Sequence, residues 1–171
     1  MKKILTFLLL FFAINMECQN ILFVGNKKYK TTQGWWFDTE ASMDNSPKIS
    51  VGKDKNNGLL IITAFTGGLK IGGTLIVYLE DDTIIVCKDR GIRDITNGEC
   101  TTVYYLTIKE IERMKYSKIM SIRYNVSSGQ FHKESYIARN VYKNYSDIEY
   151  TNNTEKPPHW NTHLDIRNLY E

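Results

Sequence analysis

The sequence predicts a mainly β fold, either an antiparallel β-sandwich or a curved sheet of about seven or eight strands, with one short helix packed on it. Two observations support this prediction. Runs of strand length that are rich in β-branched and aromatic residues recur along the chain, separated by segments rich in Gly, Asn and Asp. One segment, residues 108–115, instead repeats its apolar residues with a helical period.

The clearest strand pair consists of residues 74–79 and 83–87. Only the three acidic residues 80–82 separate the two runs, which is typical of a hairpin. An Asp-Asp turn is less favourable than Asp-Gly, because glycine adopts a positive φ at little cost. Residues 101–106 form a third run, which leads directly into the predicted helix.

The helix begins with a capping box. The Thr107 side chain can accept from the backbone N–H of Glu110, and the Glu110 side chain can accept from the backbone N–H of Thr107. Ile108, Ile111 and Met114 recur at three-residue spacing and predict one apolar stripe that covers the sheet.

Residues 118–126 predict a half-buried strand, because apolar and polar residues alternate from Met120 to Val126. Ile119 is the one exception to the alternation. Residues 27–30 and 88–100 are expected to be turn and loop. The remaining expected strands are residues 21–24, 35–43, 48–52, 58–66 and 130–138.

Three regions are expected along the chain: a signal peptide over residues 1–18, a single β-rich domain over 19–141, and an irregular or mobile tail over 142–171. Lys2 and Lys3 precede a short apolar run, as in a secretory signal. That run is too short to span a bilayer, so no transmembrane segment is expected after its removal. A secreted or periplasmic location follows. The alternative is a lipoprotein anchored through Cys18.

The charges are close to balanced. The chain has 22 basic and 19 acidic residues, a formal net charge of +3, and the two signs are interspersed along the sequence. Proteins that bind nucleic acid draw much of their affinity from clustered cations. The sequence therefore predicts no nucleic-acid partner.

Cys87 and Cys100 are the cysteines outside the expected signal. An even number of cysteines in an exported chain favours a disulfide, and these two are expected near the facing ends of adjacent strands. The alternative is a pair of unpaired core thiols.

A weak metal hypothesis concerns His159, His163 and Asp165, since residues four apart share a face of a helix. The zincin pattern would require a glutamate directly after the first histidine, and Trp160 occupies that position. We therefore expect neither a metal nor another cofactor.

The best candidate ligand-binding residues are Trp35, Trp36 and Trp160, because aromatic faces suit sugar rings and peptides. Neighbouring residues of a strand point to opposite faces, so only one of Trp35 and Trp36 can lie in the core. The outward one is expected to contact a ligand, unless the C-terminal tail covers it. No catalytic residue is predicted, because the sequence has no nucleophile elbow and no phosphate-binding loop.

A resemblance adds to this interpretation. The Cys-Gln-Asn at the end of the signal, the run from Gly72 to Cys87, and the phrases Tyr-Tyr-Leu-Thr-Ile-Lys-Glu-Ile and Ile-Met-Ser-Ile-Arg-Tyr resemble uncharacterised small secreted proteins of the Bacteroidetes type. The resemblance covers residues 72–126. It implies export in a Gram-negative cell and no catalytic residue.

The predicted function is an exported, non-catalytic interaction or ligand-binding module, an accessory protein of the cell envelope whose partner is a protein or a glycan. Two alternatives remain open. A small secreted hydrolase would show a buried carboxylate pair in a cleft. A secreted inhibitor or toxin-neutralising protein would show a rigid exposed loop or a flat apolar patch.

Overall fold

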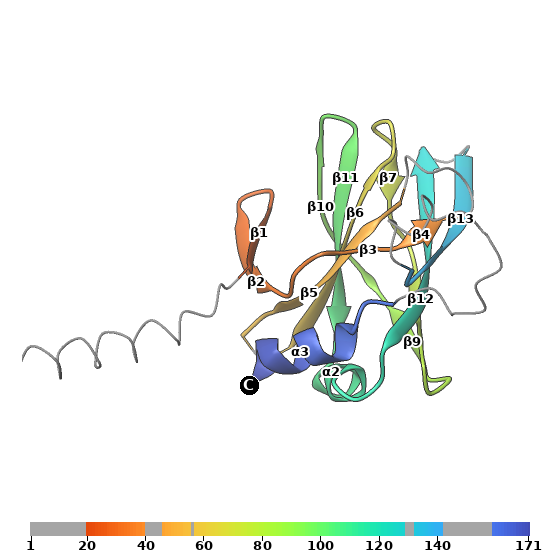
Figure 1. The fold of residues 1–171 in the computed structure, drawn as a ribbon. Helices are drawn as coiled ribbons and strands as arrows, with labels where there is room; N and C mark the ends of the chain where they lie inside the picture. The colour runs from red at the N-terminus through yellow and green to blue at the C-terminus, as the bar shows by residue number, and fades with distance from the viewer. Residues whose placement is uncertain (1–19, 40–45, 56, 129–131, 142–158) are drawn as a thin grey trace, which may run out of the picture.

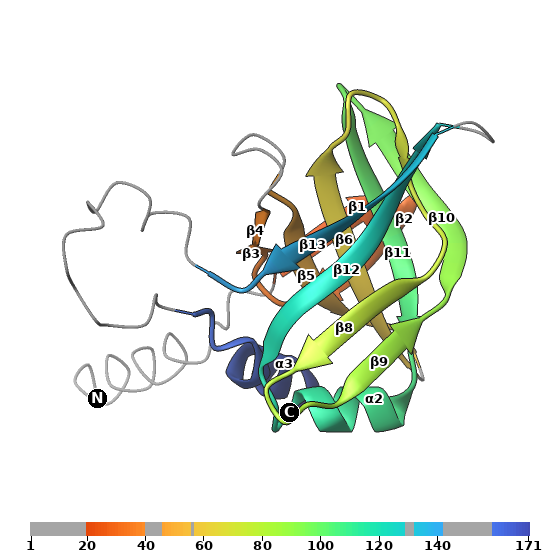
Figure 2. The same ribbon diagram turned by 90° about the vertical axis from the view of Figure 1, so that its right-hand side faces the viewer.

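The computed structural model describes residues 20–39, 46–55, 57–128, 132–141 and 159–171, so the expected signal peptide lies outside the described residues. In this part of the chain, two antiparallel β-sheets face each other across a shared core, and two helices lie together at one end of the molecule (Figures 1 and 2). The predicted mainly β fold is confirmed. The described strands outnumber the seven or eight expected, because three of them are only two residues long and because two segments expected to be turn and loop also form strands.

The first sheet has seven strands, and β3 pairs with β5 beside the main path of six. Two of its strands, β2 and β10, occupy segments that were expected to be turn and loop. The paired strands β5 and β6 match their predicted positions. In spatial order, the main path contains β1 (Asn20–Val24), β2 (Lys27–Thr31), β5 (Lys48–Lys53), β6 (Gly58–Phe65), β11 (Glu99–Leu106) and β10 (Asp89–Thr96), and β3 is Trp35–Trp36.

The second sheet has six strands, and β7 pairs with β12 beside the main path. The predicted hairpin is strands β8 and β9, and Asp82 takes the positive φ of 61° in its turn. In spatial order, the main path contains β4 (Asp38–Thr39), β13 (His132–Arg139), β12 (Ile119–Ser128), β8 (Leu75–Leu79) and β9 (Ile84–Cys87), and β7 is Lys70–Ile71.

The strand expected over residues 35–43 is divided between the sheets. Strand β3 pairs with β5 of the first sheet, whereas β4 pairs with β13 of the second. The chain therefore crosses from one sheet to the other at Phe37, whose side chain is fully buried between β3 and β4. Residues 40–43 of the predicted strand lie outside the described residues.

An irregularity in strand β12 explains why Ile119 departs from the predicted alternation. Ile122, Tyr124 and Val126 are buried, as the alternation requires, whereas Met120, which should also point inward, is only half-buried. The pairing of β12 with β8 shifts register between Ile119 and Ser121. Because such an irregularity adds a residue to one strand, the side chain of Ile119 also points inward and is fully buried.

Helix α2 (Ile108–Met114) begins with the predicted capping box. The backbone N–H of Glu110 donates to Thr107 Oγ1 at 3.3 Å, and the backbone N–H of Thr107 donates to Glu110 Oε2 at 2.6 Å. Ile111 packs closely on the start of β6. A Cβ at Gly58 would lie 2.3 Å from Ile111 Cδ1, so only glycine allows this approach.

Helix α3 (Thr162–Tyr170) lies within the segment that was expected to be an irregular tail, and that expectation is wrong for these residues. Thr162, Ile166 and Leu169 share one face of the helix and are buried. The backbone N–H of Ile119 donates to Thr162 Oγ1 at 2.9 Å, which fixes the start of α3 to β12. Residues 142–158 of the expected tail lie outside the described residues.

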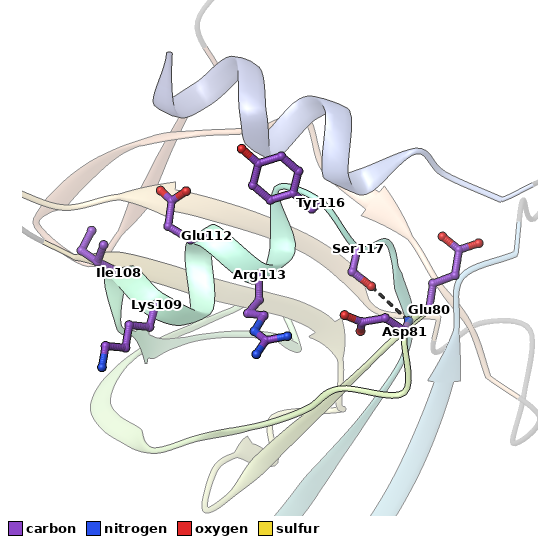
Figure 3. A pocket seen from close by; sticks show the side chains of 8 residues that line it. All are labelled: Glu80, Asp81, Ile108, Lys109, Glu112, Arg113, Tyr116 and Ser117. Atoms are coloured by element: carbon purple, nitrogen blue, oxygen red, sulfur yellow. Dashed lines mark hydrogen bonds between the residues drawn. The ribbon is translucent and has the colours of Figure 1, made fainter.

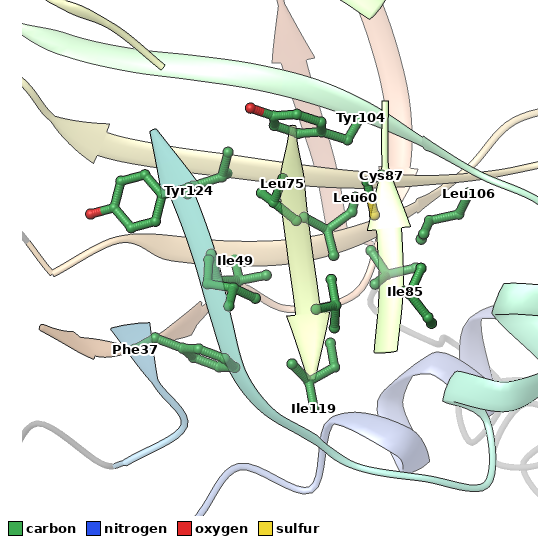
Figure 4. Close-up of a cluster of buried hydrophobic side chains, with 14 of the residues drawn as sticks. Phe37, Ile49, Leu60, Leu75, Ile85, Cys87, Tyr104, Leu106, Ile119 and Tyr124 are labelled. Atoms are coloured by element: carbon green, nitrogen blue, oxygen red, sulfur yellow. The ribbon is translucent and has the colours of Figure 1, made fainter. Parts of the chain in front are cut away.

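The main hydrophobic core lies between the two sheets and extends to both helices (Figure 4). Its side chains come from both sheets, so the sheets are packed together as in a sandwich. A second, smaller cluster lies on the outer face of the first sheet, beneath the β1–β2 hairpin. The members of this second cluster are Val24, Tyr29, Leu59, Ile61 and Val103.

Candidate functional site

The three predicted tryptophans do not form one exposed platform. Trp35 is fully buried and Trp36 is exposed, which confirms that they face opposite sides of the strand. Trp160 lies against the main core, and its indole N–H donates to the Trp36 carbonyl at 3.0 Å. The ammonium of Lys48 lies 5.8 Å from the centre of the Trp36 ring. The Trp36 ring therefore stays exposed beside a cation, and the C-terminal segment contacts Trp36 through its backbone carbonyl.

Two of the three metal candidates, His159 and Asp165, have other hydrogen-bond partners. Helix α3 begins at Thr162, so His159 precedes it and does not share a helical face with His163. A ring nitrogen of His159 is hydrogen-bonded to the Asn140 carbonyl. Asp165 accepts from the Gln33 amide and the Trp35 indole, each at 2.8 Å. Within the described ranges, no three His, Cys, Asp or Glu side chains converge as metal ligands would.

The predicted disulfide is absent, since Cys87 and Cys100 are both free, buried thiols. Cys87 lies on β9 of the second sheet and Cys100 on β11 of the first, so they are not on adjacent strands. The chain passes from the second sheet to the first at Lys88, between β9 and β10, and then reaches β11 through the turn that follows β10. Burial, with a smaller contribution from Glu110, raises the pKa of the Cys87 thiol to about 12.

A groove with a volume of about 640 Å³ lies between the outer side of α2 and the β8–β9 turn (Figure 3). We call it the helix groove. Its residues come from two segments of the chain, the acidic turn and the helix with the two residues that follow its C-cap. The lining residues are Glu80, Asp81, Ile108, Lys109, Glu112, Arg113, Tyr116 and Ser117.

Two apolar side chains of the helix groove are exposed. Ile108 is 46% exposed and Tyr116 is 75% exposed. The prediction that Ile108 belongs to the buried stripe is therefore wrong. Steps of three residues drift by about 60° around a helix of 3.6 residues per turn, and Ile108 stands at the margin of the face that Ile111 and Met114 bury.

Charges of both signs flank these apolar side chains. Lys109 and Arg113 are on the helix, whereas Glu80 and Asp81 are on the opposing turn. Hydrogen bonds from Thr83 are the main cause that lowers the pKa of the Asp81 carboxyl, so it is ionised near neutral pH. Glu80 forms an ion pair with Lys118 at 3.3 Å.

The walls of the helix groove are fixed before any ligand binds. The capping box holds the start of α2, and an Arg167 Nη2 group donates to the Lys115 carbonyl at its end, at 3.1 Å. The turn is fastened to the same segment, because the backbone N–H of Asp81 donates to Ser117 Oγ at 3.1 Å. A rigid site of this kind loses little conformational entropy on binding.

Comparisons with known proteins give no match: no family model fits the sequence, no curated protein matches it, and no solved structure matches the fold. In the described part of the chain, neither helix is long and apolar enough to cross a membrane.

The sequence interpretation did not identify Arg113 or Tyr116 as site residues. The signal that could have identified them is the spacing of Ile108, Glu112 and Tyr116, which repeats every four residues and marks a second row beside the buried stripe. No sequence signal indicates that the β8–β9 turn lines the groove, because its position there depends on how the hairpin and the helix are packed.

Proposed function

We propose that this protein is an exported, non-catalytic interaction module that binds a polypeptide segment of a partner in the helix groove. The observation behind this proposal is the exposure of Ile108, on helix α2, and of Tyr116, just after it, among lining charges of both signs. Export rests on the signal-like N-terminus and on the resemblance to secreted proteins of the Bacteroidetes type.

The mixed charge of the helix groove favours a polypeptide over a polyanion. Glu80, Asp81 and Glu112 would repel a phosphorylated or sulfated polymer, whereas a peptide presents both signs of charge together with apolar side chains. Tyrosine and arginine are also enriched among the residues that contribute most to protein interfaces. Tyr116 and Arg113 are the residues of this kind in the groove.

The volume of the helix groove is also suitable for a peptide segment. Its volume of about 640 Å³ lies within the range of about 300–1,000 Å³ found for ligand sites. An extended segment could place one apolar side chain against Ile108 or Tyr116, which lie about two helical turns apart with Glu112 between them, and direct charged side chains to the charges that line the groove. The partner segment is therefore expected to contain an apolar residue flanked by one acidic and one basic residue.

A random peptide library displayed on phage tests this proposal. Peptides selected on the wild-type protein should bind the Tyr116→Ala and Arg113→Ala variants at least about tenfold more weakly, the loss typical of an interface hot spot. Phe65→Ala is the matched control, because Phe65 is an exposed aromatic residue on strand β6, outside the groove. Selection of no peptide, or equal binding by all four proteins, would refute the proposal.

The inhibitor alternative is favoured by one further observation, a flat apolar patch on the outer face of the second sheet. Ile84 and Val86 of β9 are more than half exposed, and their cross-strand partners are Tyr78 and Ile76 of β8. A folded partner protein would cover this patch. The Ile84→Ser and Val86→Ser changes would then abolish its binding, while peptide binding in the helix groove would persist.

A further inference from the structure

The β1–β2 hairpin lies over the outer face of the first sheet and leaves a second groove at its edge. Strand β2 pairs with β5 at only two positions, after which the hairpin turns away and packs Val24 and Tyr29 on the second hydrophobic cluster. The backbone N–H of Gly25 donates to Asp94 Oδ2 at 3.3 Å, which fastens the hairpin tip to β10. The groove is thus a fixed feature of the fold.

We call this second site the cationic groove. It has a volume of about 570 Å³ and is formed by three segments that are distant in the sequence: strand β2, the β5–β6 loop with the start of β6, and strand β10. Its lining residues are Lys27, Lys28, Tyr29, Asp54, Lys55, Leu59, Arg90 and Ile92.

The charge of this groove is strongly one-sided. Four cations and a single carboxylate line it, a net of three positive charges, which equals the formal net charge of the entire chain. Among the described residues, none of Lys27, Lys28, Lys55 and Arg90 takes part in an ion pair. The positive charge is therefore available to an anionic ligand.

Arg90 is held in place without being neutralised. Its guanidinium lies 3.9 Å from the centre of the Tyr105 ring, and the Tyr105 hydroxyl is hydrogen-bonded to the Asn57 side chain. Stacking on an aromatic face orients a guanidinium and leaves its N–H donors free for oxygen atoms. A phosphate group suits such a site, because arginine can donate two parallel hydrogen bonds to it.

The outer face of the hairpin carries exposed apolar residues, and Lys28 of the cationic groove lies on this same face. Phe23 is 64% exposed and Ile21 is 48% exposed. Their cross-strand partners are Lys28 and Lys30, so the face alternates apolar and cationic side chains. Apolar side chains among lysines are typical of surfaces that enter the boundary between headgroups and acyl chains.

We propose that this hairpin attaches the protein to anionic membranes, with the phosphate of a lipid headgroup in the cationic groove and with Phe23 and Ile21 inserted into the interface. The exposed apolar residues favour a lipid over a soluble phosphate compound, which would leave them in water. The attachment is peripheral and does not involve the helix groove, so the two sites are separable by mutation.

Cosedimentation with vesicles tests the proposal. The protein without the expected signal, residues 19–171, should bind vesicles of phosphatidylcholine with phosphatidylglycerol, and it should bind pure phosphatidylcholine weakly. Binding should fall as salt is added, since salt screens exposed charges. The Lys27→Gln/Lys28→Gln variant should bind about fivefold more weakly for each cation removed. Phe23→Ser should also weaken binding, with an unchanged thermal unfolding temperature because Phe23 is exposed.

Lys70→Gln/Lys133→Gln is the matched control. Both of these lysines are exposed and lie outside the cationic groove, so the control loses the same net charge. It should bind vesicles as the wild type does. An equal loss in the control would overturn the proposal in favour of bulk charge attraction. Failure to bind anionic vesicles would overturn it too, as would binding of glycerol 3-phosphate in calorimetric titration without binding to vesicles.

Discussion

The indole N–H of Trp35 donates to Asp165 Oδ2 at 2.8 Å, although the two residues are 130 positions apart in the sequence. Gln33 donates to the same oxygen at 2.8 Å. This carboxylate therefore fastens helix α3 to the first sheet beside β3. The contact uses Asp165 as an acceptor for two neutral donors and holds Trp35 inside the core.

Asp165→Ala should lower the free energy of unfolding by about 1–3 kcal/mol, because the buried indole N–H of Trp35 would lose its acceptor. Urea unfolding followed by circular dichroism measures this change. Asp165→Asn retains a carbonyl oxygen and should have a smaller effect. Two variants as stable as the wild type would show that α3 does not depend on this bond.

Strand β12 gives a matched pair of substitutions. Ile122 is fully buried and Arg123 is exposed. Ile122→Asp should lower the free energy of unfolding by about 4 kcal/mol or more, because it places an unpaired charge in the core. Arg123→Asp should change it by less than about 1 kcal/mol. The reverse order in thermal unfolding would mean that the register of β12 is wrong.

Cys87 and Cys100 should resist alkylation in the native protein. Both thiols are buried, and the raised pKa of Cys87, about 12, keeps that thiol protonated at neutral pH. Iodoacetamide reacts with the thiolate, so labelling should require unfolding. Peptide mass spectrometry should find both cysteines labelled after denaturation without a reducing agent. A linked pair of peptides would instead show a disulfide.

His163 should make stability depend on pH. Burial is the main cause that lowers its pKa, and Lys118 and Arg167 lower it further, while Glu80 and Asp165 oppose them. As the pH falls, His163 of the unfolded chain binds a proton near pH 6.5, whereas His163 of the native state does so only at a lower pH. The contribution of His163 to the free energy of unfolding is therefore complete above about pH 6.5 and is lost as the pH drops toward the native pKa. The free energy of unfolding of His163→Gln should vary less between about pH 7.5 and pH 5 than that of the wild type. An identical dependence on pH would exclude His163 as its cause.

The fold was predictable where the local sequence signal and the pattern of buried residues indicate the same element. The β8–β9 hairpin, the capping box of α2 and the alternation in β12 each have a strong sequence signal, and all three are present. Strand β10 has a weak signal because it is an edge strand with few apolar residues and an irregularity between Asp89 and Ile92. The sequence signal of strand β2 is also weak, because only one of its faces is covered and it therefore has few apolar residues.

Helix α3 was missed for a different reason. Its N-cap, Asn161, is a favourable residue type, but Leu164 occupies the position where a capping box would have Glu or Gln, so the start signal is weak. The spacing of Thr162, Ile166 and Leu169 does indicate one helical face, but this face is stable only where α2 and the first sheet are present to cover it. The tail was therefore assigned from its polar composition alone.

The two grooves could not be predicted from the sequence. Lys27, Lys55 and Arg90 belong to separate segments, and they converge only because the β1–β2 hairpin turns over the first sheet. The interspersed charges along the chain suggested an even distribution on the surface. The helix groove similarly requires the packing of α2 beside the β8–β9 turn, which neither segment specifies by itself.

Peptide binding in the helix groove is tested most directly by following the backbone amide shifts of the ¹⁵N-labelled protein during titration with a peptide selected from the library. The largest changes should fall on residues 80–81 and 108–117, which form the groove. Changes concentrated on residues 84–86 would place the binding surface on the outer face of the second sheet. Changes on the β1–β2 hairpin would likewise contradict binding in the helix groove.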